Sequence, residues 1–576
     1  MNYQEVFNDW MRFSDSATQD ELRGLPEQER EERFYTELSF GTAGLRGMIG
    51  AGTNRMNKYV VRRATQGLCD FLLAQAAENA QRGVVIAYDS RCCSDEFAME
   101  TALTCAKNGV HAYLFDGIRA VPQLSFAVRH LHCIAGVVIT ASHNPAAYNG
   151  YKVYWEHGGQ IAPAQADAVL EAIGRIDYFG VVPMELDAAL RSGLVTMIGT
   201  DVDEAYYAAT QTLLLHPEVL AAHGADLNIV YTPLHGAGNV PVREILKRAG
   251  VSNVHVVKEQ ELPNGLFPTV AAPNPEDPNA FYLAEVLANQ TGANTLLATD
   301  PDSDRLGVAV RLPNGTFATL TGNQIGCLLI EYILSSLQEK NALPKNALVV
   351  KSIVSTRLAD AICAQYGVEI QDVLTGFRFI SEIIDTAEKT QSHQFIFGFE
   401  ESYGFLAGGF SRDKDAICAA MLIAEMCVVY ALSGMTLYDA LEKIYQKYGY
   451  YKEGICNYVL EGKAGVERIQ GAMQTLRNSP PPALAGVRVL VVEDYKAGIK
   501  TRAGGAQEPL LLPKTDMLRF VLENDAWIAV RPSGTEPKLK MYVAVTAKKE
   551  ESANILCDTI LQQMDQLLND VLGLPA

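Results

Sequence analysis

The chain has 576 residues, of which 48% are hydrophobic and 20% are charged. This length and composition are typical of a folded protein of about three to five domains rather than of a disordered chain. The 67 acidic and 48 basic residues give a formal net charge of −19. Because binding to nucleic acid depends on Lys and Arg that neutralise phosphates, this charge argues against a nucleic-acid partner. A small phosphorylated ligand remains compatible with it, since one pocket of an acidic protein can be basic.

The sequence predicts a cytoplasmic protein with no membrane partner. Residues 1–20 lack the basic start and apolar core of a signal peptide. The longest apolar segment, residues 416–432, is short for a membrane span and carries Glu425, so we expect a buried helix there. The 11 cysteines include no CxxC pair, which favours free thiols in a reducing compartment.

Short apolar segments rich in β-branched residues recur along the chain, and each ends in a turn, a helix or a polar loop. We expect strands over residues 84–89, 136–140, 228–232, 295–300, 348–353 and 395–399, and helices over residues 94–109, 240–249 and 356–366. Strands this apolar are typical of parallel or mixed sheets that are covered on both faces. The sequence therefore predicts an α/β fold, with ligands bound by loops at the carboxyl ends of the strands.

The first polar loop, residues 140–145, follows the strand predicted at 136–140 and contains Ser142 next to His143. A serine beside a histidine is a candidate nucleophile with a nearby base. An ordinary Ser/Asn/Pro turn is the alternative. The loop is not the nucleophile elbow of a hydrolase, because Gly-x-Ser-x-Gly is absent.

The second loop contains Asp300, Asp302 and Asp304 directly after an apolar strand. Aspartates at i, i+2 and i+4 fall on one side of an extended segment, so their carboxylates can converge on a hard cation. An EF-hand is excluded because Arg305 and Arg311 occupy its sixth and twelfth positions. A solvated acidic turn is the alternative. Mg²⁺ is favoured over Ca²⁺ if a substrate phosphate completes the coordination shell.

Two further loops have the composition of ligand-binding segments. Residues 398–404 include Glu400 and Ser402, whose oxygens suit sugar hydroxyls, although a surface turn is equally compatible. Residues 531–540 combine Arg531 with Ser, Thr and Gly, which is phosphate-binding chemistry without a Walker A loop. A hairpin turn with an isolated Arg is the alternative there.

Five motifs, taken together and in this order, resemble those of the α-D-phosphohexomutase family, the phosphoglucomutase/phosphomannomutase enzymes, and most closely their long bacterial form. They lie at residues 41–47, 140–145, 300–305, 398–404 and 531–537 and span nearly the whole chain. The resemblance implies four domains around a central cleft: three similar α/β domains with mixed sheets and a C-terminal α+β domain. The expected limits are residues 1–200, 201–318, 319–450 and 451–576.

The resemblance also implies roles for individual residues. Ser142 would be phosphorylated and would bind Mg²⁺ together with Asp300, Asp302 and Asp304. The implied catalytic residues are Ser142, His143, Lys152, Lys414 and Arg46. Those implied in substrate binding are Arg305, Thr375, Gly376, Arg378, Glu400, Ser402, Arg412, Arg531, Ser533, Gly534, Thr535 and Lys540.

The sequence departs from common family patterns at three positions that bear on substrate preference. Lys540 stands where members often have Arg, Phe399 replaces a common Gly, and Phe377 stands where some glucose-specific members have Trp.

The activity implied by the resemblance is the interconversion of α-D-glucose 1-phosphate and glucose 6-phosphate, with glucose 1,6-bisphosphate as intermediate and activator. Phosphomannomutase, phosphopentomutase and glucose-1,6-bisphosphate synthase are alternatives on the same scaffold. A Mg-dependent phosphatase is a further alternative. A non-catalytic sugar-phosphate sensor is another, although a sensor needs no nucleophile. The expected partner is a phosphorylated sugar, with the chain as a monomer or a dimer.

Overall fold

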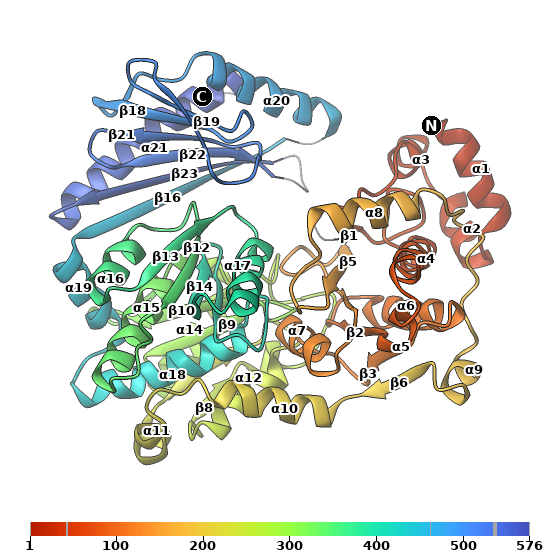
Figure 1. Ribbon diagram of the computed structural model, residues 1–576, viewed down its shortest axis with the longest axis horizontal. Helices are drawn as coiled ribbons and strands as arrows, with labels where there is room; N and C mark the ends of the chain where they lie inside the picture. Colours follow the sequence, from red (N-terminus) through yellow and green to blue (C-terminus); the bar gives the residue numbers. More distant parts are fainter. Residues whose placement is uncertain (1, 42–43, 461, 534–537, 575–576) are drawn as a thin grey trace. The chain divides into compact units, whose positions relative to one another are not determined.

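The computed structural model describes residues 2–41, 44–460, 462–533 and 538–574. By its contacts the chain divides into two compact units. The first comprises Met1–Val349 and Phe377–Tyr438, and the second comprises Val350–Gly376 and Asp439–Ala576. The elements are labelled in Figure 1.

The N-terminal part of the first unit contains a mixed six-stranded sheet. Its strands, in spatial order, are β1 (Gly44–Met48), β5 (Tyr148–Trp155), β4 (Ala135–Ile139), β2 (Val84–Tyr88), β3 (Ala112–Phe115) and β6 (Val195–Ile198). Strands β4, β2, β3 and β6 are parallel, and β5 runs antiparallel to both of its neighbours.

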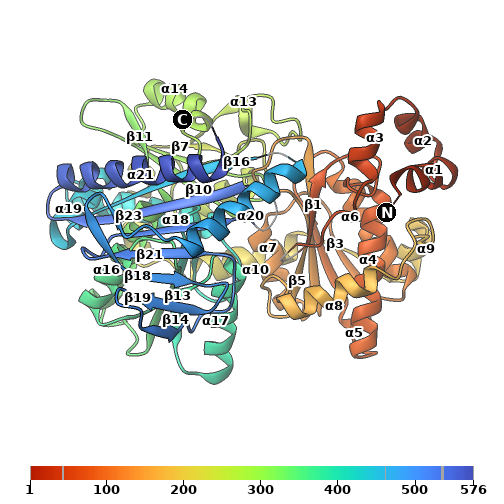
Figure 2. The ribbon, with the colours of Figure 1, turned by 90° about the horizontal axis from the view of Figure 1, so that it is seen from above.

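Helices cover both faces of this sheet, which explains why its central strands are apolar throughout. Helices α4 (Lys58–Gln75) and α6 (Ser94–Lys107) lie on one face and α7 (Val121–His130) on the other (Figures 1 and 2). The remaining helices are α1 (Tyr3–Phe13), α2 (Ser16–Arg23), α3 (Glu27–Phe34), α5 (Asn79–Arg82), α8 (Pro163–Ile173) and α9 (Leu186–Arg191).

The second sheet has five strands. In spatial order they are β11 (Phe317–Thr319), β10 (Leu306–Arg311), β9 (Thr295–Thr299), β7 (Ile229–Thr232) and β8 (Val254–Val256). Strands β9, β7 and β8 are parallel, whereas β10 is antiparallel to β9. The associated helices are α10 (Thr200–Gln211), α11 (Pro217–His223), η1 (Gly224–Asp226), α12 (Asn239–Arg248), α13 (Lys258–Glu261), η2 (Pro278–Phe281) and α14 (Tyr282–Thr291).

The third sheet has four strands in the order β13 (Glu369–Val373), β12 (Ala347–Ser352), β14 (Gln394–Glu400) and β15 (Gly404–Ala407). Its helices are α15 (Gly322–Glu339), α16 (Leu358–Tyr366), α17 (Phe377–Thr390) and α18 (Ala416–Leu432). Helix α18 is buried from Ala416 to Val428, which confirms the prediction of a buried helix. Within the described residues no single helix is long and apolar enough to cross a membrane. One bent pair, Ala416–Leu432 with Leu437–Tyr448, meets the criteria of length and composition.

The C-terminal part of the second unit is an antiparallel sheet with helices α20 (Gly462–Asn478) and α21 (Glu550–Leu572) packed against it (Figure 2). The strand order is β16 (Tyr450–Val459), β23 (Lys538–Ala547), β22 (Trp527–Pro532), β21 (Leu518–Leu522), β18 (Val487–Asp494), β19 (Ile499–Arg502) and β20 (Gln507–Pro509), with β17 (Ala483–Leu484) paired to β18. Helix α19 (Leu437–Tyr448) leads into β16.

The three α/β sheets share one strand order. The sequences β5-β4-β2-β3, β10-β9-β7-β8 and β15-β14-β12-β13 are equivalent in space. The loops β4–β5, β9–β10 and β14–β15 therefore occupy the same position in three similar domains. Each contains a non-glycine residue with positive φ: Ser142 (51°), Ser303 (52°) and Tyr403 (66°). These are the serine, aspartate and Glu400 loops of the sequence.

The predicted strands agree with the observed ones to within two residues. For example, the strands expected at 84–89 and 295–300 are β2 and β9. The predicted helices at 94–109, 240–249 and 356–366 are α6, α12 and α16. All 11 cysteines fall in the described part of the chain and are free thiols there.

Candidate active site

Ser142 lies in the turn that follows β4 and is only 5% exposed. Its backbone N–H donates to Oγ1 of Thr140 (2.8 Å), which fixes the turn. A serine with φ of 51° is held in a sparsely populated conformation, and such positions cluster at functional sites. The Ser142 hydroxyl donates to Oδ2 of Asp300 (2.7 Å) and lies 3.3 Å from Nδ1 of His143.

The Arg91 side chain, which the sequence analysis does not single out, binds the backbone of this turn. The Arg91 guanidinium donates to the backbone carbonyl of Ser142 (2.5 Å). Further carbonyls that accept from it are those of Asn144, Pro145 and Tyr148. The Arg91 side chain has no exposed surface, and burial lowers its pKa. The strand 84–89 could have suggested it, because Asp89 and Arg91 follow that strand at its carboxyl end.

Asp89 connects Arg91 to the turn as well. Its Oδ2 accepts from the Thr140 hydroxyl (2.6 Å) and lies 3.4 Å from Nε of Arg91. The same carboxylate accepts from the Arg91 backbone N–H (2.9 Å) and the Ser94 hydroxyl (2.8 Å). The carboxyl end of β2 therefore forms a rigid support for the serine turn.

The aspartate loop that follows β9 brings three buried carboxylates together. One oxygen from each of Asp300, Asp302 and Asp304 lies within 4.8 Å of the others. Oδ1 of Asp300 accepts from the backbone N–H groups of Asp304 and Arg305, both at 3.1 Å, which fixes its orientation. The spacing i, i+2, i+4 thus converges as the sequence predicted.

Two lysines from different strands and loops face the aspartates. Nζ of Lys152, on β5, lies 2.9 Å from Oδ2 of Asp302. Nζ of Lys414 lies 3.1 Å from Oδ2 of Asp304 and 3.0 Å from Oδ1 of Asp413. Lys414 also lies over the ring of Phe377 (5.3 Å).

The electrostatics of the triad favour an additional positive charge. Burial raises the pKa of Asp300 well above its ordinary value, and Asp302 and Asp304 add to the effect. Burial and Asp302 also raise the pKa of Asp304. Burial acts in the same direction on Asp302, but Lys152 outweighs it and the pKa falls. The environment therefore disfavours the charged forms of Asp300 and Asp304, and a cation at the triad would offset this effect.

The residues present fit a metal ion. Oδ1 of Asp302 and Oδ1 of Asp304 are buried and have no hydrogen-bond partner among the described residues. Buried carboxylate oxygens without a donor are costly, and a hard divalent cation satisfies them with the oxygen ligands that it prefers. The donor set of the aspartate triad therefore fits a hard divalent cation.

The third loop packs directly on the aspartate loop. The backbone N–H of Leu306 donates to the carbonyl of Tyr403 (3.1 Å), and Arg305 pairs with Gly404 in an isolated β-bridge. Glu400 is 5% exposed at the end of β14, and Ser402 is half-buried. A side chain at Gly404 would overlap that of Lys414, so the glycine makes room for the lysine.

The other cations predicted for the first unit have protein partners. Arg46 donates to Oδ1 of Asn144 (3.2 Å) in the serine turn. Arg305 pairs with Glu276, and Arg412 pairs with Glu388. Burial lowers the pKa of Arg412 to about 10, and the positive charge of Arg129 adds to this. Arg378 is half-buried at the start of α17, 4.6 Å from the Phe379 ring.

The remaining predicted residues belong to the second unit. Thr375 and Gly376 follow β13, and Gly376 has φ of 124°. Arg531 on β22 is the direct cross-strand partner of Lys540 on β23. The backbone N–H of Ser533 donates to the carbonyl of Lys538 (2.6 Å). Gly534 and Thr535 lie outside the described residues, as do residues 42–43 of the glycine-rich motif at 41–47.

Comparison with protein families finds four matches in order. Models of the phosphoglucomutase/phosphomannomutase α/β/α domains I, II and III match residues 37–179, 204–314 and 321–448. The model of the C-terminal domain of the same enzymes matches residues 486–560.

Curated relatives match over nearly the full length. A phosphoglucomutase of Staphylococcus saprophyticus is 39% identical over 559 residues, which cover 96% of this chain and 98% of the relative. A phosphoglucomutase of Staphylococcus aureus (strain MRSA252) is 37% identical over 539 residues, covering 93% of this chain and 94% of the relative.

Solved structures show the same fold. The phosphoglucomutase parafusin from Paramecium superposes with a TM-score of 0.69 at 16% identity, covering 93% of this chain and 96% of the other. A phosphoglucomutase/phosphomannomutase family protein from Burkholderia thailandensis gives a TM-score of 0.62 at 18% identity, covering 92% and 97%.

The repeated α/β domains and the serine facing an aspartate triad define an enzyme of the phosphohexomutase class. The chain belongs to the phosphoglucomutase/phosphomannomutase family, with all four of its domains.

Proposed function

We propose that the chain interconverts α-D-glucose 1-phosphate and glucose 6-phosphate through a phosphorylated Ser142 and a glucose 1,6-bisphosphate intermediate. The hydrogen bond from Ser142 Oγ to Asp300 (2.7 Å) carries this proposal, because it joins the nucleophile to the metal-binding carboxylates. Relatives named phosphoglucomutase, at 37–39% identity over nearly the whole chain, support the choice of glucose.

The proposed metal is Mg²⁺, held by Asp300, Asp302 and Asp304 together with an oxygen of phosphorylated Ser142. When bound, it would neutralise part of the charge on the transferring phosphoryl group. Lys152 and Lys414 flank the triad and supply fixed positive charge beside the same group.

The proposed reaction consists of two phosphoryl-transfer steps at Ser142. A sugar hydroxyl attacks the phosphorus on Ser142, the new O–P bond forms, and the bond to Ser142 Oγ breaks. The hydroxyl proton passes to a base, and His143 is a candidate because its Nδ1 lies 3.3 Å from Ser142 Oγ. After the bisphosphate reorients, Ser142 Oγ attacks the phosphorus of the other phosphate and the bond between that phosphorus and the sugar oxygen breaks. The sugar oxygen takes the proton back from the base, and Ser142 is phosphorylated again.

Residues that take no part in the phosphoryl transfer would orient the substrate. We propose that Glu400 and Ser402 accept hydrogen bonds from sugar hydroxyls and that Arg531, Ser533 and Lys540 bind the phosphate that does not react. Arg46 would support the serine turn through Asn144.

A coupled assay tests the proposal. Glucose 1-phosphate, mannose 1-phosphate and ribose 1-phosphate are compared, with inorganic phosphate followed in parallel. Fast conversion of glucose 1-phosphate without phosphate release is expected. A preference for mannose 1-phosphate would indicate a phosphomannomutase, and a preference for ribose 1-phosphate would indicate a phosphopentomutase. Release of inorganic phosphate would indicate a phosphatase.

Intact-mass measurement should find one phosphate that Ser142→Ala lacks, and a fully active Ser142→Ala would refute the phosphoserine mechanism.

A further inference from the structure

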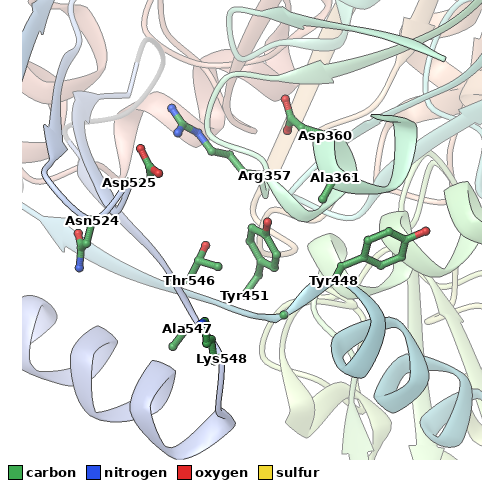
Figure 3. A pocket seen from close by; sticks show the side chains of 11 residues that line it. Arg357, Asp360, Ala361, Tyr448, Tyr451, Asn524, Asp525, Thr546, Ala547 and Lys548 are labelled. Carbon is green, nitrogen blue, oxygen red and sulfur yellow. The ribbon is translucent and has the colours of Figure 1, made fainter. Parts of the chain in front are cut away.

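The second unit contains a cleft of about 520 Å³ that the proposed reaction does not use (Figure 3). One wall is the start of α16, with Arg357 and Asp360. The opposite wall is formed by the β21–β22 turn with Asp525 and by the end of β23 with Lys548. Its volume lies in the range of small-molecule sites, about 300–1,000 Å³.

This cleft is separate from the segment proposed to bind phosphate. Strands β22 and β23 pair from Trp527↔Ala544 to Pro532↔Leu539. Arg531 and Lys540 lie at one end of this hairpin, whereas Asp525 and Lys548 lie beyond the other end. Six residues at about 3.3 Å each place the two ends roughly 20 Å apart.

The cleft is lined by two basic side chains, Arg357 and Lys548, and two acidic ones, Asp360 and Asp525. Arg357 and Lys548 form no hydrogen bond or ion pair through their side chains with any residue that the structure describes. Asp360 lies 3.3 Å from Lys351, which also lies 2.6 Å from Asp372. Asp525 is then the one carboxylate lining the cleft without an ion pair among the described residues. Arg357 and Lys548 can therefore both donate to a phosphate, while Asp525 can accept from a hydroxyl of the same ligand.

Neutral hydrogen-bonding groups complete the lining. The side chains of Tyr448, Tyr451, Asn524 and Thr546 all border the cleft (Figure 3). Hydroxyl and amide groups beside a guanidinium are suited to a ligand that has hydroxyls as well as a phosphate. We propose that this cleft binds a small hydroxylated organic phosphate, of the sugar-phosphate class, as an effector.

The position of the cleft explains how an occupant would act. Tyr448, Gly449 and Tyr451 form the link between α19 and β16, through which the chain enters the C-terminal sheet. Gly449 has φ of 100°, a conformation that other residues rarely adopt, which suits a hinge. A phosphate held by Arg357 and Lys548 joins α16 to the end of β23 across this link. The same hairpin bears Arg531 at its other end.

Hydrogen exchange measured by mass spectrometry on the full chain tests the proposal independently of catalysis. Fructose 1,6-bisphosphate, inorganic phosphate and unphosphorylated fructose serve as probes. Fructose 1,6-bisphosphate at millimolar concentration should slow exchange at least threefold in peptides covering residues 446–452. The double variant Arg357→Gln/Lys548→Gln should lose this protection. Lys549→Gln, which changes the adjacent exposed lysine, should keep it.

Three results would overturn the proposal. One is the absence of protection by fructose 1,6-bisphosphate in the wild type. Another is equal protection in the double variant, which would place binding elsewhere. The third is equal protection by inorganic phosphate, which would make the cleft a simple anion site. Both replaced side chains are at least partly exposed, and circular dichroism verifies that the double variant is folded.

Discussion

The hydroxyl of Ser142 donates a 2.7 Å hydrogen bond to Oδ2 of Asp300, a residue 158 positions further along the chain. Ser142 follows β4 and Asp300 follows β9, and these strands occupy the same place in two sheets of equal strand order. The distance between Ser142 and Asp300 is therefore set by the packing of two similar domains rather than by one local loop. Changes in either loop should affect the same chemical step.

Asp302→Asn should weaken the response to Mg²⁺. Asp302 accepts from Lys152 (2.9 Å) and Thr140 (3.2 Å), while its Oδ1 has no hydrogen-bond partner among the described residues. The substitution keeps the shape and removes one negative charge from the proposed metal shell. We expect kcat/KM to fall about 100-fold, or roughly 2.7 kcal/mol, and the Mg²⁺ concentration for half-maximal rate to rise. Asp226→Asn, at an exposed aspartate, is the matched control. Unchanged rates at low Mg²⁺ would contradict the assignment.

Arg91→Lys should lower kcat with a smaller effect on KM. The lysine keeps the charge, but its ammonium cannot reach the carbonyls that the guanidinium binds at Ser142, Asn144, Pro145 and Tyr148. Buried acceptors left without donors cost about 1–3 kcal/mol each, so the turn should lose its fixed geometry. Steady-state kinetics and the phosphorylated fraction of Ser142 measure the effect.

Arg62→Lys provides the control for this substitution. Arg62 is also held by several hydrogen bonds, in its case a bidentate pair with Glu100 (2.6 and 2.7 Å), and is not part of the proposed site. A purely structural role for Arg91 would lower Tm in both variants while leaving kcat intact.

The contribution of Asp415 to the stability of the protein should fall as the pH rises from about 4 to 6. Burial raises the pKa of this carboxyl to about 6. In this window the folded protein keeps a proton that the unfolded chain releases, so the free energy of unfolding decreases with pH. The difference from the ordinary value of 3.8 corresponds to about 3 kcal/mol.

Asp415→Asn removes this titration and can still accept the hydrogen bond from the Cys418 backbone N–H at the start of α18. The Tm of the wild type should therefore fall relative to that of the variant between pH 4 and 6, and the difference should stay constant above pH 6.5. Parallel Tm curves across the whole range would show that Asp415 does not titrate in this window.

The strands and the aspartate triad could be predicted from the sequence because their signals are local. Apolar β-branched segments mark buried strands, and the alternation of Asp300, Asp302 and Asp304 places three carboxylates on one side of the chain. Arg91 could not be assigned in this way. Its carbonyl partners lie 51–57 positions away, and an isolated arginine has no local pattern that distinguishes it from a surface cation.

The ion-pair partners and packing neighbours of individual side chains could not be predicted from the sequence either. Arg412 pairs with Glu388 on α17, a partner that no local pattern indicates, and its role in substrate binding stays a prediction. Phe399 replaces a glycine common in the family, yet its ring is fully buried against Gly326 and leaves Glu400 in place on the next position. Such pairings depend on tertiary packing, which periodicity and composition do not encode.

Arg531→Ala tests whether the C-terminal domain contributes to substrate binding. Arg531 and Lys540 are direct cross-strand partners on β22 and β23, so their side chains share one face of the sheet. Like charges placed opposite each other destabilise a sheet, and a bound phosphate would relieve the repulsion. The variant should therefore keep or slightly raise its Tm in phosphate-free buffer and lose most of the stabilisation that added phosphate gives.

Hydrogen bonds to a charged group are worth about 1.5–3 kcal/mol, so the kcat/KM of Arg531→Ala should fall roughly 10- to 100-fold with both sugar phosphates. Arg488→Ala, at an exposed arginine that pairs with Glu523, should change neither quantity. Normal kinetics of Arg531→Ala together with an unchanged response of Tm to phosphate would place phosphate binding elsewhere, with Lys538 and Lys540 as the next residues to replace.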